Sequence, residues 1–492
     1  MKHGVLALDQ GSHASRACIF DESGSLCATA MVPVATQQPD VMHVEQDAEE
    51  LAQSLQAAAE QALAIALRSQ PRFELAAAGL AVQRSTIVCC DRSDGAALTP
   101  AISWQDRRNA AWLANLSPHT ARIAELTGLP LSPHYGASKI RWCLDHLPAV
   151  RAAAASGNLL VAPLASFLVL RLTGAGPRHG AIPADAVLVD PANASRTLLF
   201  DSRRLDWSDE LLELFAIERC WLPRCTATRA AWGRLQLRGC EVELRAVTGD
   251  QSAVPYAAGA ATTDTVYVNL GTGAFIQRPV SNWPAAPAPL LGSVLSCDAG
   301  AAVYSLEGTV NGAGSAISWF CAQRGCHEAP LWTALESLPE QTALPIFLNG
   351  IGGLGSPWWR ADLQTRFVDA DDSAGKVLET TLGHFAAVVD SIVFMVAANF
   401  DLLAQQAGAP RRVLLAGGMS RSAWLCRRLA ALIGLPVEVL DAEASALGVA
   451  RLAAPQLASR WTAVTTQAWH PVPDAMLQAR YRRFVAAVAG AA

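Results

Sequence analysis

Short apolar runs separated by small polar turns occur at the start and near the middle of this chain of 492 residues. Residues 5–8 and 15–20 are mainly apolar, and the polar turn DQGSH lies between them. The segment VYVNLGTGAFIQ, at residues 266–277, has the same layout. Each segment predicts a strand, a turn and a second strand. Because the layout repeats and the chain is too long for one core, we expect two domains, residues 1–245 and 246–492.

A helix is predicted after Asp47, which suits an N-cap, and Glu50 has the spacing that closes a capping box. The apolar residues at helical spacing along its face are Leu51, Leu55, Ala58, Ala62 and Ile65. Further strands are predicted at residues 75–82, 243–248 and 413–416, and further helices around residues 107–115, around residues 139–147 and from residues 420–422. The mixture predicts an α/β fold.

The composition narrows the class of protein. Apolar residues make up 51% of the chain and the net charge is −5, so there is no basic field for nucleic acid. We expect no secretion signal and no membrane-spanning segment, because apolar stretches such as residues 391–400 have the length of a core helix. The 12 cysteines lack CxxC spacing, which favours reduced thiols over a zinc site and agrees with a cytoplasmic location.

Two familiar nucleotide motifs do not apply. Gly350, Gly352 and Gly355 satisfy G-x-G-x-x-G, but Pro357 and two tryptophans follow where a dinucleotide site needs a helix. The P-loop sequence is absent.

The two repeated turns are candidate phosphate sites. Gly11 lies in the first turn and Gly271-Thr272-Gly273 in the second, and small residues let main-chain N–H groups approach phosphate oxygens. Asp9, beside the first turn, could hold Mg²⁺ through water. Ordinary hairpin turns are the alternative, and the matching positions of the two turns argue against it.

Two strand ends carry further candidates. Asp250 follows a predicted strand, where a carboxylate could accept a proton from an attacking hydroxyl, although a turn or N-cap aspartate is commoner. Gly417 and Gly418 follow the strand at 413–416 and would let a nucleotide approach closely, or form a tight turn.

In chain order, nine segments resemble motifs of the FGGY family of carbohydrate kinases, and most of all its glycerol kinase branch. The segments are VLALDQGSHASRACIFD, AVQRST with ISWQDRR, SKIRWCLDH, NASRTLLFDSRRLDW, VTGDQSA, NLGTGAF, SLEGTV, GIGGLGSPWWR and LLAGGMSRS. They cover nearly the whole chain. The resemblance implies two actin-like (ribonuclease H-like) ATPase domains flanking a catalytic cleft, with ATP and Mg²⁺ as cofactors.

The resemblance also implies roles for single residues. Asp250 would be the catalytic base, and Asp9 would be associated with the metal ion. Residues expected at the substrate are Arg84, Ser85, Trp104, His134, Tyr135, Asp250, Gln251 and Phe275. Residues expected at the nucleotide are Gly11, Ser12, Arg16, Gly271, Thr272, Gly273, Asn311, Gly417 and Gly418.

Two positions depart from the glycerol kinase pattern. Glycerol kinase has a glutamate where this chain has Ser85, and it has a tyrosine that falls on His134, with Tyr135 as the neighbour. A neutral, shorter side chain at position 85 would weaken glycerol binding about 10- to 100-fold and leave room for a longer substrate.

We therefore expect an ATP-dependent kinase that phosphorylates a hydroxyl of a small sugar or polyol larger than glycerol. A true glycerol kinase and a catalytically silent actin-like nucleotide- or sugar-binding protein are the alternatives. The expected partners are the small molecule and ATP, with no nucleic acid and no membrane. The sequence leaves open the identity of the substrate, the hydroxyl that is phosphorylated, whether His134 or Tyr135 faces the substrate, an allosteric effector and a homo-oligomeric state.

Overall fold

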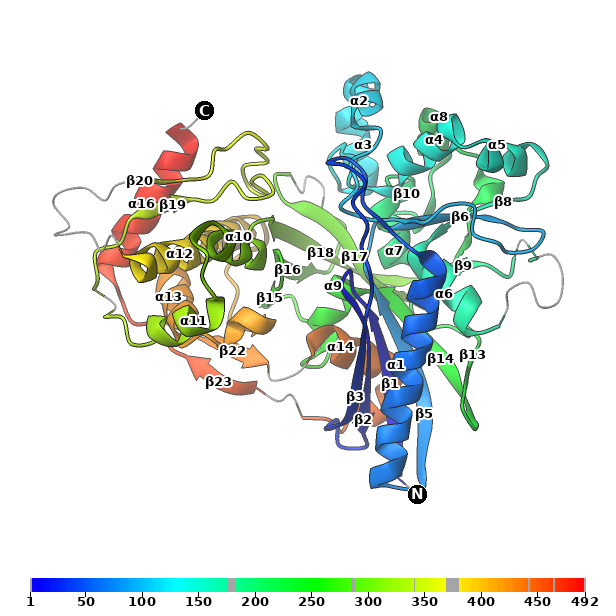
Figure 1. Cartoon of the computed structure of the whole chain (residues 1–492), viewed down its shortest axis with the longest axis horizontal. Coiled ribbons are helices and arrows are strands. Elements are labelled where there is room, and N and C mark those ends of the chain that lie inside the picture. Colours follow the sequence, from blue (N-terminus) through cyan, green and yellow to red (C-terminus); the bar gives the residue numbers. More distant parts are fainter. Residues whose placement is uncertain are drawn as a thin grey trace.

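Two sheet-rich domains lie side by side in a computed structural model of the chain (Figure 1). The structure describes residues 2–174, 182–183, 185–284, 288–339, 341–368, 380–440, 443–462 and 465–490.

The first domain is built on a sheet of six strands in the order β13-β14-β5-β1-β2-β3. Its strands are β1 (Lys2–Gln10), β2 (Ala14–Asp21), β3 (Leu26–Pro33), β5 (Phe73–Val82), β13 (Arg234–Leu237) and β14 (Cys240–Gly249). β1, β2 and β3 are antiparallel neighbours, whereas β5 runs parallel to both β1 and β14. The strands predicted at residues 5–8, 15–20, 75–82 and 243–248 are confirmed within β1, β2, β5 and β14.

The second domain repeats this arrangement in a sheet of seven strands, β17-β18-β16-β15-β21-β22-β23. Its strands are β15 (Thr265–Leu270), β16 (Ala274–Val280), β17 (Leu291–Asp298), β18 (Ala301–Val310), β21 (Arg412–Ala416), β22 (Val437–Leu440) and β23 (Thr465–Trp469). β18, β16 and β15 correspond to β3, β2 and β1, and the parallel strands β21 and β22 correspond to β5 and β14. Two such sheets in one chain make up the actin-like ATPase fold that the sequence predicts.

The other elements surround these sheets. A small antiparallel sheet contains β4 (Glu45–Gln46), β6 (Ile87–Asp91), β7 (Ala101–Ile102) and β8 (Leu159–Pro163). Two-stranded pairs join β9 (Leu188–Val189) to β12 (Arg224–Cys225), β10 (Phe200–Asp201) to β11 (Asp206–Trp207), and β19 (Ile346–Leu348) to β20 (Arg366–Val368). The α-helices of the first domain are α1 (Ala48–Ser69), α2 (Ala110–Leu113), α3 (Thr120–Thr127), α4 (Gly136–His146), α5 (Pro148–Ala155), α6 (Leu164–Leu172), α7 (Pro191–Ala194) and α8 (Asp209–Phe215). Those that follow are α9 (Asp250–Ala253), α10 (Gly314–Arg324), α11 (Glu328–Leu335), α12 (Thr381–Ala407), α13 (Ala423–Ile433), α14 (Ala444–Ala453), α15 (Pro455–Ala458) and α16 (Ala475–Gly490).

Helix α1 begins where its cap predicts. The Asp47 carboxylate accepts hydrogen bonds from the main-chain N–H groups of Glu49 and Glu50, at 2.9 and 3.0 Å. The predicted return bond of the capping box is wrong, because the Glu50 carboxylate accepts instead from the N–H of Ala35, at 3.4 Å. The predicted apolar face is buried, apart from Ile65, which is partly exposed.

Helix α12 is far longer than the ten residues 391–400 suggested. It has 27 residues and enough apolar length to cross a membrane, but most of it is buried in the second domain against β16, β18, α13 and α16. Core helices of globular domains have this all-round apolar surface, so we assign α12 to the core.

Helix α14 connects the two domains. It lies late in the chain, yet it packs against β1, β5 and β14 of the first sheet (Figure 1). The contact is close, because a Cβ atom on Gly79 of β5 would lie 2.7 Å from the carbonyl oxygen of Val449. One face of the first sheet is thus covered by α1 and α6, and the other by α14. The domain boundary expected at residue 245 falls within β14.

Candidate active site

Three parallel strands of the first sheet bring candidate residues to one edge. Asp9 is paired with Ala81 near the end of β1, Thr248 of β14 is paired with the same Ala81, and Asp250 follows β14 directly. Arg84 follows the end of β5 by two residues. Because these strands are parallel neighbours, their carboxyl ends meet, and Asp9, Arg84 and Asp250 gather at one edge.

A buried ion cluster joins the two domains at this edge. The guanidinium of Arg84 donates to both carboxylate oxygens of Glu307 on β18, with Nη1–Oε2 at 3.1 Å and Nη2–Oε1 at 3.2 Å. Nη2 of Arg196, which follows α7, lies 2.7 Å from Oε1 of Glu307, and Nε2 of Gln277 donates to Oε2 at 3.0 Å. Glu307 is fully buried. Burial would raise the pKa of Glu307, but Arg196 and Arg84 outweigh it and hold that pKa at about 2.

The pKa values of Asp250 and Asp9 are raised, in contrast to the lowered pKa of Glu307. Burial raises the pKa of Asp250, and the charge of Arg84 opposes the rise. Burial, and then the charge of Asp250, raise the pKa of Asp9 to about 7. The main-chain N–H of Gln251 donates to Oδ1 of Asp250 at 2.6 Å, and the Gln251 side chain accepts from Asn269 of β15 at 3.0 Å. The Asp250 carboxylate is therefore held by the main chain at the start of α9, and burial makes its protonated form more favourable than in an exposed aspartate.

The remaining predicted substrate residues form the wall beside Arg84. Ser85 has a left-handed backbone, with φ 66°, and its Oγ is buried without a hydrogen-bond partner among the described residues. The ring of His134 lies 5.5 Å from that of Trp104 and 4.9 Å from that of Tyr135, measured between centroids. His134 is partly exposed, whereas Tyr135 is 3% exposed. The guanidinium carbon of Arg84 lies 5.9 Å from the centre of the Phe275 ring.

Lys139 holds the main chain of two of these residues, Ser85 and His134, in place. Its side chain is fully buried, and Nζ donates to the main-chain oxygens of Ser85, at 3.0 Å, and His134, at 2.6 Å. The motif around Lys139 resembles a family signature, but the sequence does not indicate this role, because neither the burial of Lys139 nor its partners can be seen in the sequence. Among the described residues its Nζ has main-chain oxygens as partners and no carboxylate, which is rare for a buried lysine.

The two predicted phosphate turns are hairpins in matching places. The N–H of Gly11 donates to the carbonyl of Ala14, at 3.1 Å, in the turn between β1 and β2, and the N–H of Gly271 donates to the carbonyl of Gly273, at 2.9 Å, between β15 and β16. Gly417 lies beside the second turn with φ +95°, and a Cβ atom there would lie 2.3 Å from the carbonyl oxygen of Leu270. Only glycine fits such a position.

Three predicted nucleotide residues have other partners in this structure. The hydroxyl of Ser12 donates to Gln83, at 2.7 Å, and accepts from Nε1 of Trp104, at 2.8 Å. Arg16 forms an ion pair with Glu443, which precedes α14. The amide of Asn311 donates to the carbonyls of Gly352 and Gly353, each at 3.1 Å. Gly418 begins a short helical turn and has open space beside it.

Sequence reasoning assigned no role to Glu307, Arg196 or Gln277. Glu307 lies in SLEGTV and Arg196 in NASRT, two motifs that resemble family segments without indicating what these side chains bind. A charged residue within an apolar strand such as β18 must find a partner when it is buried, and that rule was the available signal.

Gly249 sets how closely β14 approaches Arg84. A Cβ atom at Gly249 would lie 2.6 Å from the Cγ and Cδ atoms of Arg84. We expect Gly249→Ala to displace the guanidinium and to lower kcat/KM for the acceptor roughly 10- to 100-fold, since misplacements of about 1 Å have that effect. The KM for ATP should change little. Steady-state kinetics would test this, with Gly490→Ala as the control because no atom lies within 4 Å of that position. Equal kinetics for the two variants would contradict the expectation.

Comparison with known proteins identifies the family. The model of the FGGY family of carbohydrate kinases, N-terminal domain, matches residues 4–271, and that of the C-terminal domain matches residues 266–457. A glycerol kinase of Bordetella parapertussis is 33% identical over 512 residues, covering 98% of this chain and 96% of the relative. One of Citrifermentans bemidjiense is 32% identical over 461 residues, covering 91% and 89%.

Solved structures agree on the fold. A Plasmodium falciparum glycerol kinase with ADP superposes with a TM-score of 0.85 at 20% identity, covering 99% of this chain and 98% of its own. A xylulose kinase from Rhodospirillum rubrum gives a TM-score of 0.82 at 21% identity, with the same coverage. The chain therefore belongs to the FGGY family of carbohydrate kinases, ATP-dependent phosphotransferases that act on an alcohol group.

Proposed function

We propose that the chain phosphorylates a hydroxyl of a small sugar or polyol other than glycerol, with Asp250 as the general base. The observation that supports this most is the gathering of Asp9, Arg84 and Asp250 at the carboxyl ends of neighbouring parallel strands, on the side of the first sheet where the hairpin of Gly11 lies. Ser85 and His134 depart from the glycerol kinase pattern, which is the reason for preferring another acceptor.

In the proposed reaction, Arg84 and Trp104 orient the acceptor, with Phe275 and Gln251 beside it. Of the two aromatic neighbours, we place His134 at the acceptor because it is the more exposed. The Asp250 carboxylate takes the hydroxyl proton as the substrate oxygen forms a bond to the γ-phosphorus. The bond from the γ-phosphorus to the β,γ-bridging oxygen breaks, and its electron pair leaves with ADP.

The two hairpins are proposed to bind the phosphates through their main-chain N–H groups, at Gly11, Ser12, Gly271, Thr272 and Gly273. The Ser12 hydroxyl is already engaged, so its contribution would come from the main chain. Arg16 would exchange its ion pair with Glu443 for a phosphate. Gly417, Gly418 and Asn311 are proposed at the adenosine end.

The residues present fit a magnesium ion brought with ATP. The described residues contain no cluster of three or more His, Cys, Asp or Glu side chains that could hold a metal ion by themselves. Mg²⁺ bound with a nucleotide needs only one or two carboxylates beside the phosphates. Asp9 and Asp250 repel one another electrostatically, and a cation would relieve this repulsion. When bound, Mg²⁺ would neutralise charge on the phosphate oxygens.

A coupled ADP-release assay with Mg-ATP across polyols, aldoses, ketoses and sugar acids would test the proposal. Glycerol belongs in the panel because relatives at 32–33% identity are named glycerol kinases. We expect turnover with at least one acceptor other than glycerol, at a kcat/KM at least about tenfold above that for glycerol. Preference for glycerol would support the alternative of a glycerol kinase proper. ADP release no faster than the reaction with water for every compound would overturn the proposal.

A further inference from the structure

A closed ring of hydrogen bonds holds the first phosphate hairpin. The hydroxyl of Ser12 donates to Oε1 of Gln83 at 2.7 Å, and Nε2 of Gln83 donates to Oε1 of Gln46 at 2.7 Å. Nε2 of Gln46 closes the ring by donating to the main-chain oxygen of Ser12 at 2.8 Å. A further bond enters from Trp104, whose Nε1 donates to Oγ of Ser12 at 2.8 Å. Neither glutamine takes part in the proposed reaction.

The direction of each bond in this ring is fixed by its chemistry. The main-chain oxygen of Ser12 can only accept, and the indole N–H of Trp104 can only donate. Gln46 must therefore turn its NH₂ group towards Ser12 and its oxygen towards Gln83, and the Ser12 hydroxyl directs its proton to Gln83. The ring uses the hydroxyl and the carbonyl of Ser12 and leaves out its main-chain N–H. That N–H is the group proposed to bind phosphate, so the ring orients Ser12 without competing with the nucleotide.

The two glutamines are buried and come from different elements. Gln46 ends β4 and is 1% exposed, and Gln83 directly follows β5 and is 3% exposed. A buried amide that loses its partners is costly, and the bonds of a closed ring strengthen one another. The position of Ser12 is therefore set by β4 and β5 together, in addition to its own hairpin.

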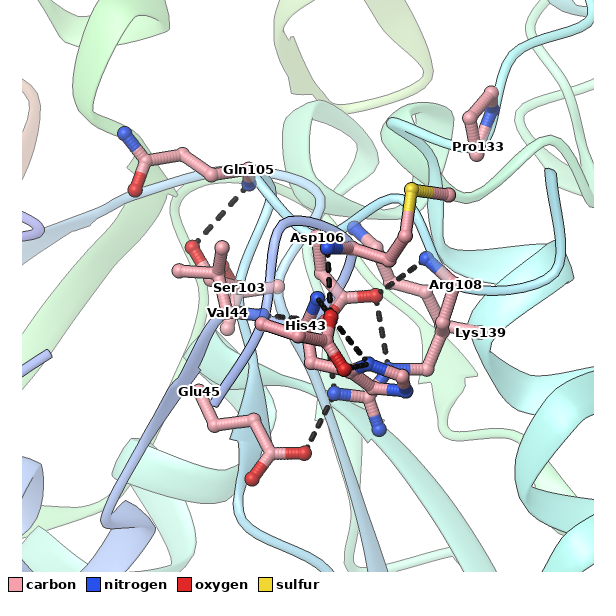
Figure 2. Close-up of polar contacts among 12 residues, drawn as sticks. His43, Val44, Glu45, Ser103, Gln105, Asp106, Arg108, Pro133 and Lys139 are labelled. Atoms are coloured by element: carbon pink, nitrogen blue, oxygen red, sulfur yellow. Dashed lines mark hydrogen bonds and ion pairs between the residues drawn. The ribbon is translucent and has the colours of Figure 1, made fainter. Parts of the chain in front are cut away.

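The segment that carries Gln46 is fastened to the segment that carries Trp104. β4 pairs with β7, which ends two residues before Trp104. Beyond this pairing, the main-chain N–H of Val44 donates to the buried carboxylate of Asp106 at 2.7 Å, and Arg108 holds both oxygens of that carboxylate, at 2.8 and 2.7 Å (Figure 2). Gln46 and Trp104 therefore belong to one rigid unit, which contacts Ser12 at both its carbonyl and its hydroxyl.

The same unit reaches the acceptor wall. The ring of Trp104 lies 5.5 Å from that of His134, measured between centroids. The Ser12 hydroxyl is thus one hydrogen bond away from a side chain proposed to orient the acceptor, while the Ser12 main chain belongs to the hairpin proposed to bind phosphate. In-line transfer requires these two places to be aligned, because a misplacement of about 1 Å costs on the order of 100-fold in rate.

We propose that Gln46 and Gln83 are positioning residues, which hold the phosphate hairpin at Ser12 in alignment with Trp104. Through this ring Trp104 contributes to nucleotide binding without touching the nucleotide. The inference rests on the proposed function, since it takes phosphate to bind at the hairpin and the acceptor to bind at Trp104. Coupling between two sites is reciprocal, so an acceptor that orders Trp104 strengthens nucleotide binding by the same factor as nucleotide strengthens acceptor binding.

Nucleotide binding in the absence of any acceptor tests the proposal. The ligand is the Mg²⁺ complex of β,γ-imido-ATP, titrated into the full chain by calorimetry. Gln46→Leu should weaken its binding about 10- to 100-fold, because Gln83 and the Ser12 carbonyl lose their partner. Trp104→Phe keeps an aromatic face and removes only the indole donor, and it should weaken binding about 3- to 10-fold. If Trp104 served the acceptor alone, Trp104→Phe would leave the nucleotide affinity unchanged. Unchanged affinity in either folded variant would overturn the inference.

A double variant separates a shared ring from two local defects. Gln83→Leu breaks the same ring as Gln46→Leu, so the combined variant should bind the nucleotide about as weakly as the weaker single variant. Losses that multiply would mean independent damage and would overturn the inference. The controls are Gln53→Leu, at an exposed position of α1, and Trp469→Phe, on the edge strand β23, and both should bind as the unaltered chain does. If a glutamine variant fails to fold, Trp104→Phe still decides the matter.

Failure of the proposed function would give a different result. If the unaltered chain does not bind β,γ-imido-ATP, the nucleotide site and this inference are both overturned. If it binds the nucleotide but turns over no acceptor, the kinase proposal falls, while weakened binding in Trp104→Phe would still support the ring. Equal binding by the unaltered chain and the variants would overturn the inference and leave the kinase function standing.

Discussion

Asp250→Asn is expected to lower kcat by about 10²- to 10⁴-fold, the contribution typical of a general base. Asparagine has the same shape, and its oxygen can still accept the hydrogen bond from Gln251, but an amide cannot take up the hydroxyl proton. The nucleotide should bind with nearly unchanged affinity, since the base faces the acceptor. Steady-state kinetics and nucleotide titration on the purified variant would measure both quantities.

The pH profile gives this prediction a second readout. A general base must be ionised, so activity falls as the pH drops through its pKa. Burial raises the pKa of Asp250, so the acid limb of the kcat/KM profile should lie at a higher pH than an ordinary aspartate would give. Asp250→Asn should remove that limb. Asp209→Asn is a suitable control because the Asp209 carboxylate is 87% exposed. A variant that keeps more than a tenth of kcat with an unchanged acid limb would contradict the assignment.

Glu307→Gln is expected to destabilise the chain by about 3 to 5 kcal/mol, because it leaves the buried cations Arg84 and Arg196 without a counter-charge. It should also raise the KM for the acceptor, since Arg84 loses the partner that holds it. The shift of the unfolding midpoint in urea, followed by tryptophan fluorescence, would measure the stability change. The exposed ion pair of Arg122 with Glu210 provides the control, and Glu210→Gln should leave the midpoint unchanged.

The pairing of Glu307 with Arg84 and Arg196 also makes the stability of the chain depend on pH. The pKa of Glu307 is about 2 in the folded chain, against 4.5 as its ordinary value. The stabilisation is therefore fully present above about pH 4.5 and is lost as the pH falls towards 2. Glu307→Gln should flatten this part of the stability profile. Parallel acid unfolding curves for the two proteins would show that the ion cluster does not contribute as described.

The pattern of apolar and polar residues predicted the sheets well, because each strand and each turn is formed by a short continuous segment of the sequence. The hairpins at Gly11 and Gly271 and the strand before Asp250 are of this kind. The partners of Arg84 could not be predicted in this way. Arg84 and Glu307 are 223 positions apart, and their pairing depends on how the two domains pack. Ser12 and Arg16 were assigned to the nucleotide alone because their other partners are also distant in the sequence: Trp104 is 92 positions from Ser12, and Glu443 is 427 positions from Arg16.

The position of α14 has a consequence for how the chain is made. When the ribosome has finished β14, all strands of the first sheet exist, but the helix that covers one face of that sheet is still unsynthesised. The apolar surface at Val5, Ala7, Phe20 and Ala77 stays uncovered until Ala444–Ala453 have been synthesised. Nascent chains with such exposed surface aggregate readily. We therefore expect truncations before α14 to depend on chaperones, and the two halves of the chain to fold well only when they are synthesised together.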